Sequence, residues 1–182
     1  MTIRPARERD IPELLAIYNY EVEHGVATLD LNPRTLDEWK EWFSAHQTDS
    51  HFILAGEENG AAIGYASLSE YRQKEAYAST AELSVYISPD FRRKGAGSAL
   101  IGAVLDRAKE CGTLHSVVSV ITAGNDVSEK LHQKFGFAFC GTLHQVGFKH
   151  GKYHDIDNFE LIFDGQNSVS YTHLTLPTIL LV

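Results

Sequence analysis

The segment from residue 85 to residue 101 constrains this chain more than any other part of its sequence. An apolar strand pattern ends at Ser88-Pro89-Asp90, and a helical pattern begins around Gly97. Between them lies a basic, glycine-containing turn, Arg92-Arg93-Lys94-Gly95. Glycine lets a ligand approach the backbone closely, and a helix start offers unpaired N–H groups that favour anions. The segment therefore predicts a seat for a pyrophosphate group.

A plainer interpretation of this segment is a turn with a solvent-exposed basic tip, since short glycine motifs carry a real risk of chance matches. The spacing Arg-x-x-Gly-x-Gly, directly after an apolar strand, favours the pyrophosphate site. The turn lacks the Lys-Ser/Thr ending of a P-loop, which disfavours a site for a nucleoside triphosphate and magnesium. It also lacks the third glycine of a Rossmann fingerprint.

Composition limits the class of protein. The chain has 182 residues, of which 43% are hydrophobic and 10% aromatic, and this suits a soluble globular domain with a substantial core. Its net charge of −8 disfavours nonspecific binding to nucleic acid, which needs a broad basic surface. The basic turn stands out against this acidic background, and the contrast suits the steering of a polyanionic cofactor.

Cysteine usage and apolar runs bear on the compartment. Cys111 and Cys140 lack Cys-x-x-Cys spacing, so a reduced, cytoplasmic protein is expected. No run approaches the roughly 20 apolar residues of a membrane span, and no signal peptide is visible. His150 and His154 have i,i+4 spacing, but Gly151 and the absence of a helical pattern weaken a metal-ligand pair. We expect no metal, no membrane partner and no nucleic-acid partner.

Hydrophobic periodicity predicts a mixed α/β order of strand, two helices, three strands, helix, strand, helix and two strands. The expected strands are Thr2 to Ala6, Phe52 to Ala55, Ala61 to Leu68, Ser79 to Ile87, Ser116 to Thr122, about Ala138 to Leu143 and about Ile156 to Phe163. The later helices are expected from about Gly97 to Glu110 and from Ser128 to Phe135. Asn59-Gly60 predicts a hairpin turn.

Local signals set several finer expectations. Asp10 with Glu13, and Thr35 with Glu38, predict capping boxes at the starts of the first two helices. Alternation in the strand that ends at Ile87 predicts one face with Leu83, Val85 and Ile87, and another with Glu82, Ser84 and Tyr86. The following helix has an apolar stripe formed by Leu100, Ile101, Val104, Leu105 and Ala108.

The C-terminal end differs in character from the rest. Residues 166–170 resemble a linker, and residues 171–182 are uncharged and rich in Leu and Thr. We interpret residues 1–165 as one domain and residues 166–182 as a non-native or disordered tail. A genuine C-terminal strand is the alternative.

The run Val85 to Leu100 resembles the acetyl-CoA signature of the GNAT superfamily of N-acetyltransferases. Glu82 to Phe137, together with Phe148 to Asp155, resembles the branch that acetylates phosphinothricin and methionine sulfoximine or sulfone. The resemblance covers roughly residues 2–164. It implies a central, mostly antiparallel sheet that is splayed at the cofactor strand and flanked by helices. It also implies an acetyl-CoA-dependent enzyme that acetylates the α-amino group of a small amino-acid-like acceptor, and a homodimer.

The resemblance suggests catalytic roles for Glu82 and His132. Glu82 matches a glutamate proposed as general base, a role that a pKa raised by partial burial would suit; the alternative is a solvated or salt-bridged strand carboxylate. His132 stands where many members have a tyrosine proposed as general acid, although the phosphinothricin branch shares the histidine. Thiols with a pKa of about 8.5 can leave unaided. General acid, cofactor contact and packing therefore all stay open for His132.

The expected cofactor-binding residues are Val85, Tyr86, Ile87, Arg92, Arg93, Lys94, Gly95, Ala96, Gly97, Ser98, Asn125 and Ser128. The strand residues are expected to pair with the pantetheine arm through their backbone, and one N–H to polarise the acetyl carbonyl. The turn residues are expected to bind the pyrophosphate. Asn125 matches a family asparagine that contacts the arm, or is a turn residue. Ser128 is a helix N-cap, a cofactor contact, or both.

The expected acceptor-binding residues are Arg72, its neighbour Tyr71, and Lys149. A guanidinium pairs well with a carboxylate, which suits an amino-acid acceptor. The methionine sulfoximine subgroup has a second arginine where this chain has Ala78, so the resemblance does not specify the exact acceptor. The family also implies that residues 24–32 line the acceptor pocket, with an ordinary connection as the alternative. Residues 148–155 are expected to close this pocket.

Three other functions remain open. The same fold could acetylate a protein N-terminus or another amine; an enclosed pocket with Arg72 favours a small anionic acceptor, and an open groove favours a peptide. A noncatalytic CoA-binding module is disfavoured by the presence of Glu82. A nucleotide-binding regulatory domain would be stabilised by ATP and not by CoA.

Overall fold

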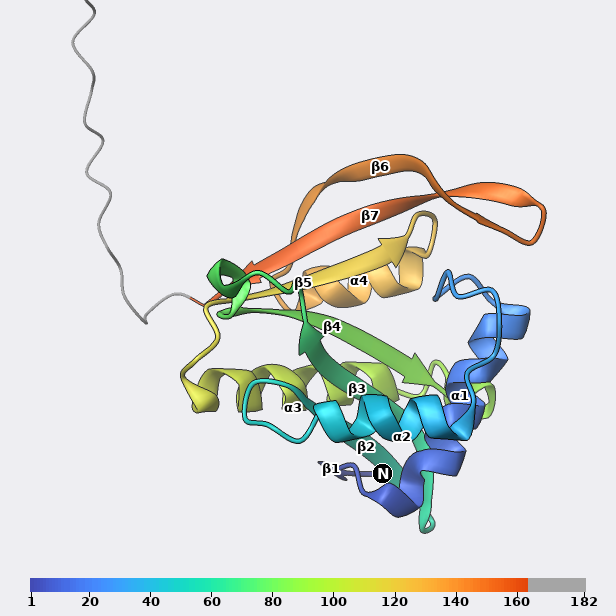
Figure 1. The fold of residues 1–182 in the computed structure, drawn as a ribbon, viewed down its shortest axis with the longest axis vertical. Helices are drawn as coiled ribbons and strands as arrows, with labels where there is room; N and C mark the ends of the chain where they lie inside the picture. The colour runs from blue at the N-terminus through green and yellow to red at the C-terminus, as the bar shows by residue number, and fades with distance from the viewer. Residues whose placement is uncertain (164–182) are drawn as a thin grey trace, which may run out of the picture.

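A mixed sheet of seven strands organises residues 1–163, which are the residues that the computed structural model describes (Figure 1). The strands are β1 (Thr2–Pro5), β2 (Phe52–Glu58), β3 (Ala61–Glu70), β4 (Thr80–Ile87), β5 (Ser116–Thr122), β6 (Ala138–Lys149) and β7 (Lys152–Ile162). The α-helices are α1 (Ile11–His24), α2 (Leu36–Ala45), α3 (Ala96–Cys111) and α4 (Asp126–Lys134). This order confirms the predicted one. The expected tail at residues 166–182 lies outside the described residues.

The sheet opens between its central strand, β4, and the neighbouring β5. The strand order is β1-β2-β3-β4-β5-β7-β6, and the pairs are antiparallel except β4 with β5, which is parallel. Within residues 1–163, β4 and β5 pair only from Thr80–Ser116 to Glu82–Val118, although β4 continues to Ile87 and β5 to Thr122. The two strands therefore diverge beyond Glu82, which confirms the predicted mostly antiparallel, splayed sheet.

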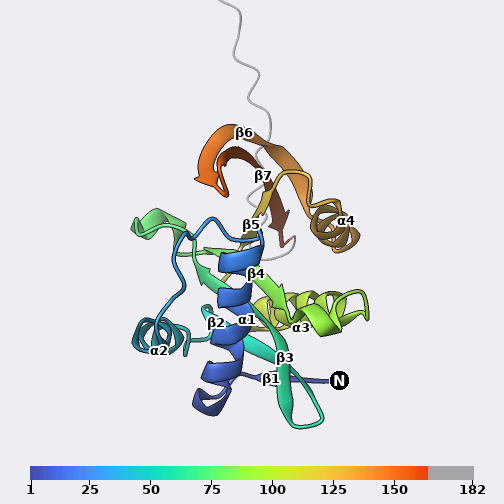
Figure 2. The same ribbon diagram turned by 90° about the vertical axis from the view of Figure 1, so that its right-hand side faces the viewer.

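Helices cover both faces of the sheet. Figure 2 shows α1 and α2 on one side, and α3 and α4 on the other. The α3 side holds the larger core, and the predicted apolar stripe of α3 is buried in it: Leu100, Ile101, Val104, Leu105 and Ala108. The α1–α2 side has a smaller core rich in aromatic rings, with Trp39, Phe43 and Tyr65. No helix among residues 1–163 is both long and apolar enough to cross a membrane.

The predicted two faces of β4 are confirmed. Leu83 is buried in the larger core, and Val85 and Ile87 pack against it. Glu82 and Ser84 instead point to the α1–α2 side, where they line a cavity. One strand thus separates two chemically different surfaces.

The two predicted capping boxes have different outcomes. Thr35 and Glu38 form the predicted box, since the Thr35 hydroxyl accepts from the Glu38 N–H at 3.3 Å and the Glu38 carboxylate accepts from the Thr35 N–H at 2.7 Å. The box at Asp10 is wrong. The Asp10 carboxylate accepts from Arg4 at 2.6 and 2.8 Å, and Glu13 accepts from the Ala62 N–H at 2.6 Å. These carboxylates tie α1 to the sheet and leave its end uncapped by a side chain.

One predicted turn is confirmed, and the ends of two other elements differ from the predictions. The Asn59-Gly60 turn is confirmed, with φ of 54° and 86°. Asn125, and not Ser128, is the N-cap of α4, because the Asn125 side-chain Oδ1 accepts from the Ser128 N–H at 3.2 Å. The last two strands are longer than predicted, so residues 148–155 form the end of a hairpin that turns at His150-Gly151.

Candidate active site

The basic turn leads directly into α3 and forms one wall of a cavity of about 650 Å³. Arg93 and Gly95 have φ of 60° and 86°, so the turn is tight, and Gly95 is the N-cap of α3. The first N–H groups of a helix have no acceptor within the helix, and here they border the cavity. Together with the Arg93 guanidinium they make this end of the cavity suited to an anion.

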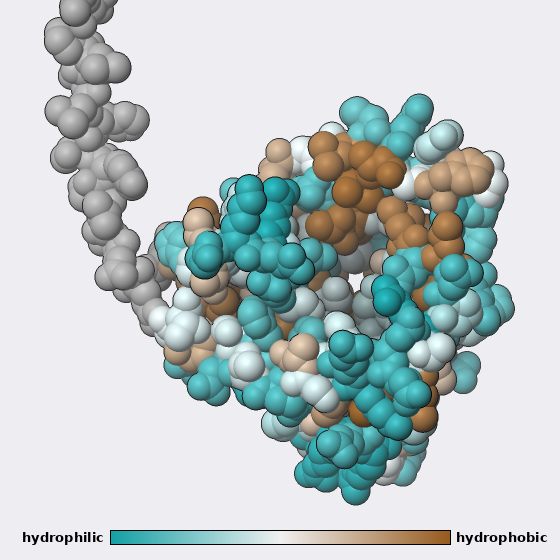
Figure 3. Space-filling model, viewed as in Figure 1, coloured by the Kyte–Doolittle hydropathy of each residue, from teal (hydrophilic) through white to brown (hydrophobic). Residues whose placement is uncertain are grey.

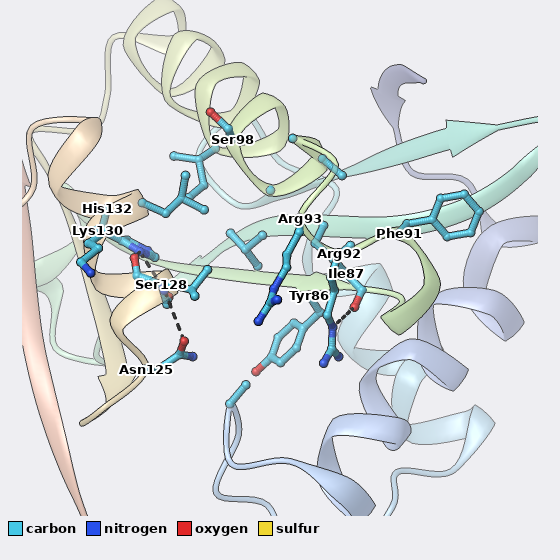
Figure 4. A pocket seen from close by; sticks show the side chains of 18 of the residues that line it. Tyr86, Ile87, Phe91, Arg92, Arg93, Ser98, Asn125, Ser128, Lys130 and His132 are labelled. Atoms are coloured by element: carbon cyan, nitrogen blue, oxygen red, sulfur yellow. Dashed lines mark hydrogen bonds between the residues drawn. The ribbon is translucent and has the colours of Figure 1, made fainter.

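The structure brings the expected cofactor-binding residues together, with the exception of Lys94. The cavity is lined by Val85, Tyr86, Ile87, Arg92, Arg93, Gly95, Ala96, Gly97, Ser98, Asn125, Ser128 and His132, among others. Figure 4 shows the two arginines on one side and Asn125, Ser128 and His132 on the other. The Lys94 ammonium instead lies 5.2 Å from the centre of the Phe91 ring.

Arg92 has a partner that the sequence reasoning did not identify. Its guanidinium donates to the Ile87 carbonyl at 3.1 Å and forms an ion pair with Glu21 of α1. Glu21 is buried and lines the same cavity. The available signal was a carboxylate at a position of α1 that continues the helical spacing of Leu14 and Ile17. This ion pair joins α1 to the turn.

A narrow slot of about 70 Å³ continues the cavity between the diverging strands. It shares Val85, Tyr86, Asn125, Ser128 and His132 with the larger cavity, and β5 adds Ser119 to Thr122. Beyond Glu82 the β4 backbone does not pair with β5 in the described part of the chain. An extended chain with hydrogen-bonding groups can therefore pair with this strand edge.

Both ring nitrogens of His132 have protein partners. The ring is buried, with Nδ1 at 2.8 Å from the Ser128 carbonyl and Nε2 at 2.9 Å from the Ser119 hydroxyl. Burial lowers the pKa of His132. A carbonyl can only accept, so Nδ1 carries the hydrogen, and the Nε2 of the neutral ring accepts from Ser119. The neutral ring therefore has no proton to offer to the slot.

A second cavity, of about 290 Å³, lies on the α1–α2 side of β4. Aromatic side chains form much of its wall, and polar side chains from β3 and β4 form its floor. Its lining residues are Tyr18, Thr28, Arg34, Glu38, Trp39, Trp42, Tyr65, Ser67, Ser69, Glu82, Ser84 and Tyr86. Burial raises the pKa of Glu82. Tyr86 lines both this cavity and the larger one.

The three expected acceptor-binding residues do not line this second cavity. The Arg72 guanidinium lies over the rings of Tyr71 and Tyr77, at 5.0 and 5.6 Å from their centres. Lys149 is buried and donates to the Thr28 carbonyl at 2.8 Å, and burial lowers its pKa. The cation that lines the cavity is Arg34, which the sequence reasoning did not identify.

The connection between α1 and α2 contributes Thr28 to the second cavity and is held by several long-range contacts. The Tyr18 hydroxyl donates to Asp30 at 2.7 Å, and Asp30 forms an ion pair with Arg34 at 2.7 Å. Lys149 of β6 fixes the Thr28 carbonyl from the other side. Within residues 24–32, which the family resemblance places at the acceptor pocket, Thr28 alone lines the cavity.

No group of three or more potential metal ligands occurs within residues 1–163. His150 and His154, which the sequence places four residues apart, bind different carbonyls. The His150 ring lies 3.2 Å from the Gly25 oxygen, and the His154 ring lies 3.0 Å from the Lys149 oxygen.

Comparison with known proteins gives consistent results. Residues 14–137 match the model of the acetyltransferase (GNAT) family. The L-methionine sulfoximine/L-methionine sulfone acetyltransferase of Pseudomonas paraeruginosa is 38% identical over 168 residues, which are 92% of this chain and 97% of that protein. A phosphinothricin acetyltransferase from Sinorhizobium meliloti, solved with acetyl-CoA, has a TM-score of 0.85 at 30% identity and covers 97% and 95% of the two chains. A ribosomal-protein-alanine N-acetyltransferase from Brucella melitensis has a TM-score of 0.86 at 36% identity and covers 90% and 100%.

Proposed function

The chain belongs to the acetyltransferase (GNAT) family, and from this premise we propose that it acetylates the α-amino group of a small amino-acid-like acceptor with acetyl-CoA. The observation that carries the proposal is the pair of cavities that meet at Tyr86 of β4. The larger cavity suits a long anionic donor, and the smaller one suits a compact acceptor. Phosphinothricin, methionine sulfoximine and methionine sulfone, after which relatives are named, are the candidate acceptors.

The residues of the larger cavity fit acetyl-CoA in two respects. The start of α3 and Arg93 would hold the pyrophosphate, since both favour negative charge. The unpaired edge of β4 from Leu83 to Ile87 would hold the pantetheine arm through backbone hydrogen bonds. One of these N–H groups would also stabilise negative charge that develops on the acetyl oxygen.

Glu82 is the proposed general base. An α-amino group has a pKa of about 7.7–8.0, and it is nucleophilic only in its neutral form. Acetyl-CoA supplies the acetyl group as a thioester, whose C–S bond breaks as the new C–N bond forms, and CoA leaves as its thiolate. Glu82 takes the proton that the amine gives up, and its raised pKa makes it a better base than an exposed glutamate. His132 is proposed as a residue that packs beside the thioester and orients Ser119.

The smaller cavity is the proposed acceptor cavity, and it favours a small substrate over a long peptide. Its volume is about 290 Å³, and aromatic rings close much of its wall. Arg34 is the proposed partner for the acceptor carboxylate, because it lines this cavity. Arg72, Tyr71 and Lys149 do not line it, and their role in acceptor binding stays a prediction. The second candidate function is acetylation of a protein N-terminal alanine, which the similarity to the Brucella protein favours.

A thiol-release assay separates the two functions. The acceptors should be α-amino acids, their sulfone, sulfoximine and phosphinic analogues, and an alanine-initiated peptide. We expect turnover with one or more of the small acceptors and little with the peptide. If only the peptide reacts, the substrate proposal is wrong while the family assignment stands.

A homodimer and a cytoplasmic location complete the proposal. The β6–β7 hairpin exposes Leu143, Val146, Phe148 and Tyr153, and Figure 3 shows apolar side chains gathered over this part of the molecule. A second copy of the chain would cover them. Cys111 and Cys140 are free in the described structure, which suits a reducing compartment.

A further inference from the structure

The floor of the acceptor cavity is a ladder of polar pairs between β3 and β4. Ser69 lies opposite Glu82, and Ser67 lies opposite Ser84. Directly opposite residues in an antiparallel pair have Cβ atoms about 4.5–5.5 Å apart, so their side chains are close neighbours. All four residues line the cavity. The proposed base therefore has a serine hydroxyl beside it.

A buried histidine outside the cavity controls this hydroxyl. His46 follows α2 and is 6% exposed, with Nε2 at 2.7 Å from the Ser69 Oγ and Nδ1 at 2.6 Å from the Trp42 carbonyl. Since a carbonyl can only accept, Nδ1 carries the ring hydrogen. Burial lowers the pKa of His46, which keeps the ring neutral and leaves a lone pair on Nε2. The Ser69 O–H must therefore donate to His46.

This direction fixes what Ser69 offers to a ligand. A serine hydroxyl has one hydrogen, and Ser69 donates it in the hydrogen bond to His46. The Ser69 oxygen can therefore only accept hydrogen bonds from the cavity. The neighbouring Glu82 carboxylate is also an acceptor. An amine fits this pair because it has two or more N–H donors. A hydroxyl group would leave one of the two acceptors unpaired, and a carboxylate would be repelled.

We infer that Ser69 and Glu82 together bind the acceptor amine, and that His46 fixes the direction of the Ser69 hydroxyl hydrogen. We call this pair the amine seat. Ser69 accepts one N–H of the amine and so directs another toward Glu82, which takes the proton. Ser69 is thus a substrate-binding residue and His46 a positioning residue that acts through it. This inference rests on the proposed function, because it assigns the residues that recognise the acceptor of that same reaction.

An independent observation concerns a second polar atom on this floor. The Ser67 side-chain oxygen is buried and has no hydrogen-bond partner within residues 1–163. Buried hydroxyls are normally paired, so an unpaired one that faces a cavity is suited to a ligand atom. Ser67 lies two residues before Ser69 on the same face of β3, next to the proposed amine seat.

Steady-state kinetics with the full-length protein and an accepted amino acid test the inference. We expect Ser69→Ala to raise the KM for the amine about tenfold, the loss of roughly one hydrogen bond, and to leave the KM for acetyl-CoA unchanged. His46→Leu should have the same effect, because Ser69 then turns its hydrogen toward the cavity. His46→Gln should restore the wild-type KM, since its side-chain oxygen can accept from Ser69.

Ser44→Ala is the matched control, because Ser44 lies on α2 near His46 but donates to the Lys40 carbonyl of its own helix. Its kinetics should equal those of the wild type. If Ser69→Ala keeps the wild-type amine KM while the wild type acetylates amino acids normally, the amine seat is wrong and the proposed function stands.

A spectroscopic measurement tests the seat without any substrate. Nitrogen-15 NMR of the histidine rings, with the His46 signals assigned by their loss in His46→Gln, should show hydrogen on Nδ1 and none on Nε2. The opposite tautomer would overturn the inference, whichever amine is acetylated. If the wild type acetylates no α-amino acid, the proposed function fails, and the tautomer still decides the direction of the Ser69 hydrogen bond.

Discussion

The proposed donor cavity and the proposed acceptor cavity share β4 but are built from different kinds of sequence. The donor cavity takes most of its lining from two short stretches, residues 85–98 and residues 125–134. The acceptor cavity combines side chains from α1, the connection after it, α2, β3 and β4. The first can hold its ligand with backbone groups of a turn and a strand edge, whereas the second depends on individual side chains. We therefore expect substitutions to affect the two cavities separately.

The largest expected effect tests whether Glu82, which lines the acceptor cavity, takes the proton of the amine. Glu82→Gln should lower kcat by about 100- to 1000-fold, because the amide cannot take a proton from the amine. The affinity for acetyl-CoA, measured by calorimetry, should stay unchanged, since Glu82 lines the acceptor cavity and not the donor cavity. Unchanged turnover at saturating amine would contradict the role of Glu82.

The pH profile of the wild type sharpens this test. Burial raises the pKa of Glu82 above its ordinary value of 4.5, and the base acts in its deprotonated form. The kcat at saturating amine should therefore fall with decreasing pH, at a midpoint above 4.5. The contribution of Glu82 to folding stability changes with pH in the opposite direction to its contribution to turnover. The folded protein binds this proton more tightly than the unfolded chain, so the Glu82 contribution favours folding at low pH and is lost as pH rises through the raised pKa.

The same contrast explains which parts of the fold were predictable. The donor turn, the apolar stripe of α3 and the Asn59-Gly60 hairpin are local patterns, and each appears where the sequence indicated it. The β6–β7 hairpin was predicted too short. Most of β6 is exposed, and buried and exposed residues do not alternate along it. Its register with β7 is also interrupted twice. The alternating hydrophobic pattern that predicts a strand is therefore weak there.

The misassigned cap and the missed acceptor residues have a shared cause. Asp10 and Glu13 match a capping pattern, yet their partners are Arg4 and the backbone of Ala62 on neighbouring strands. In the same way, no local pattern marks Arg34 or Ser69 as cavity residues. Only the packing of α1 and α2 against β3 and β4 brings them together. Local sequence could indicate the proposed donor cavity, but not the side chains that line the proposed acceptor cavity.

The next prediction compares two arginines in the acceptor region. Arg34→Gln should raise the KM for an amino-acid acceptor about tenfold, because Arg34 lines the cavity and can pair with a carboxylate. Arg72→Gln is the matched variant, and its effect should be smaller, since the Arg72 guanidinium lies over Tyr71 and Tyr77. A larger effect for Arg72 would mean that the connection after β3 closes over the bound acceptor.

The smallest expected effect concerns the backbone of the donor turn, for which the chain offers a close control. Gly95 and Gly60 both have φ of 86° and open space where a Cβ would lie. An alanine at either position adopts a left-handed conformation that L-residues disfavour, so each substitution should lower the free energy of unfolding by about 1–2 kcal/mol. Equal losses in chemical denaturation would show that the strain is matched.

Only Gly95 lies at the donor cavity, where it caps α3, while Gly60 lies in the β2–β3 turn. Because relaxation of the strained turn shifts the N–H groups at the start of α3, Gly95→Ala should weaken acetyl-CoA binding about three- to fivefold, a cost of under about 1 kcal/mol. Gly60→Ala should leave binding unchanged. If both variants bind acetyl-CoA as the wild type does, the conformation of the turn does not determine donor affinity. The affinity for acetyl-CoA would then depend on side chains of the donor cavity, as we infer for amine binding in the acceptor cavity.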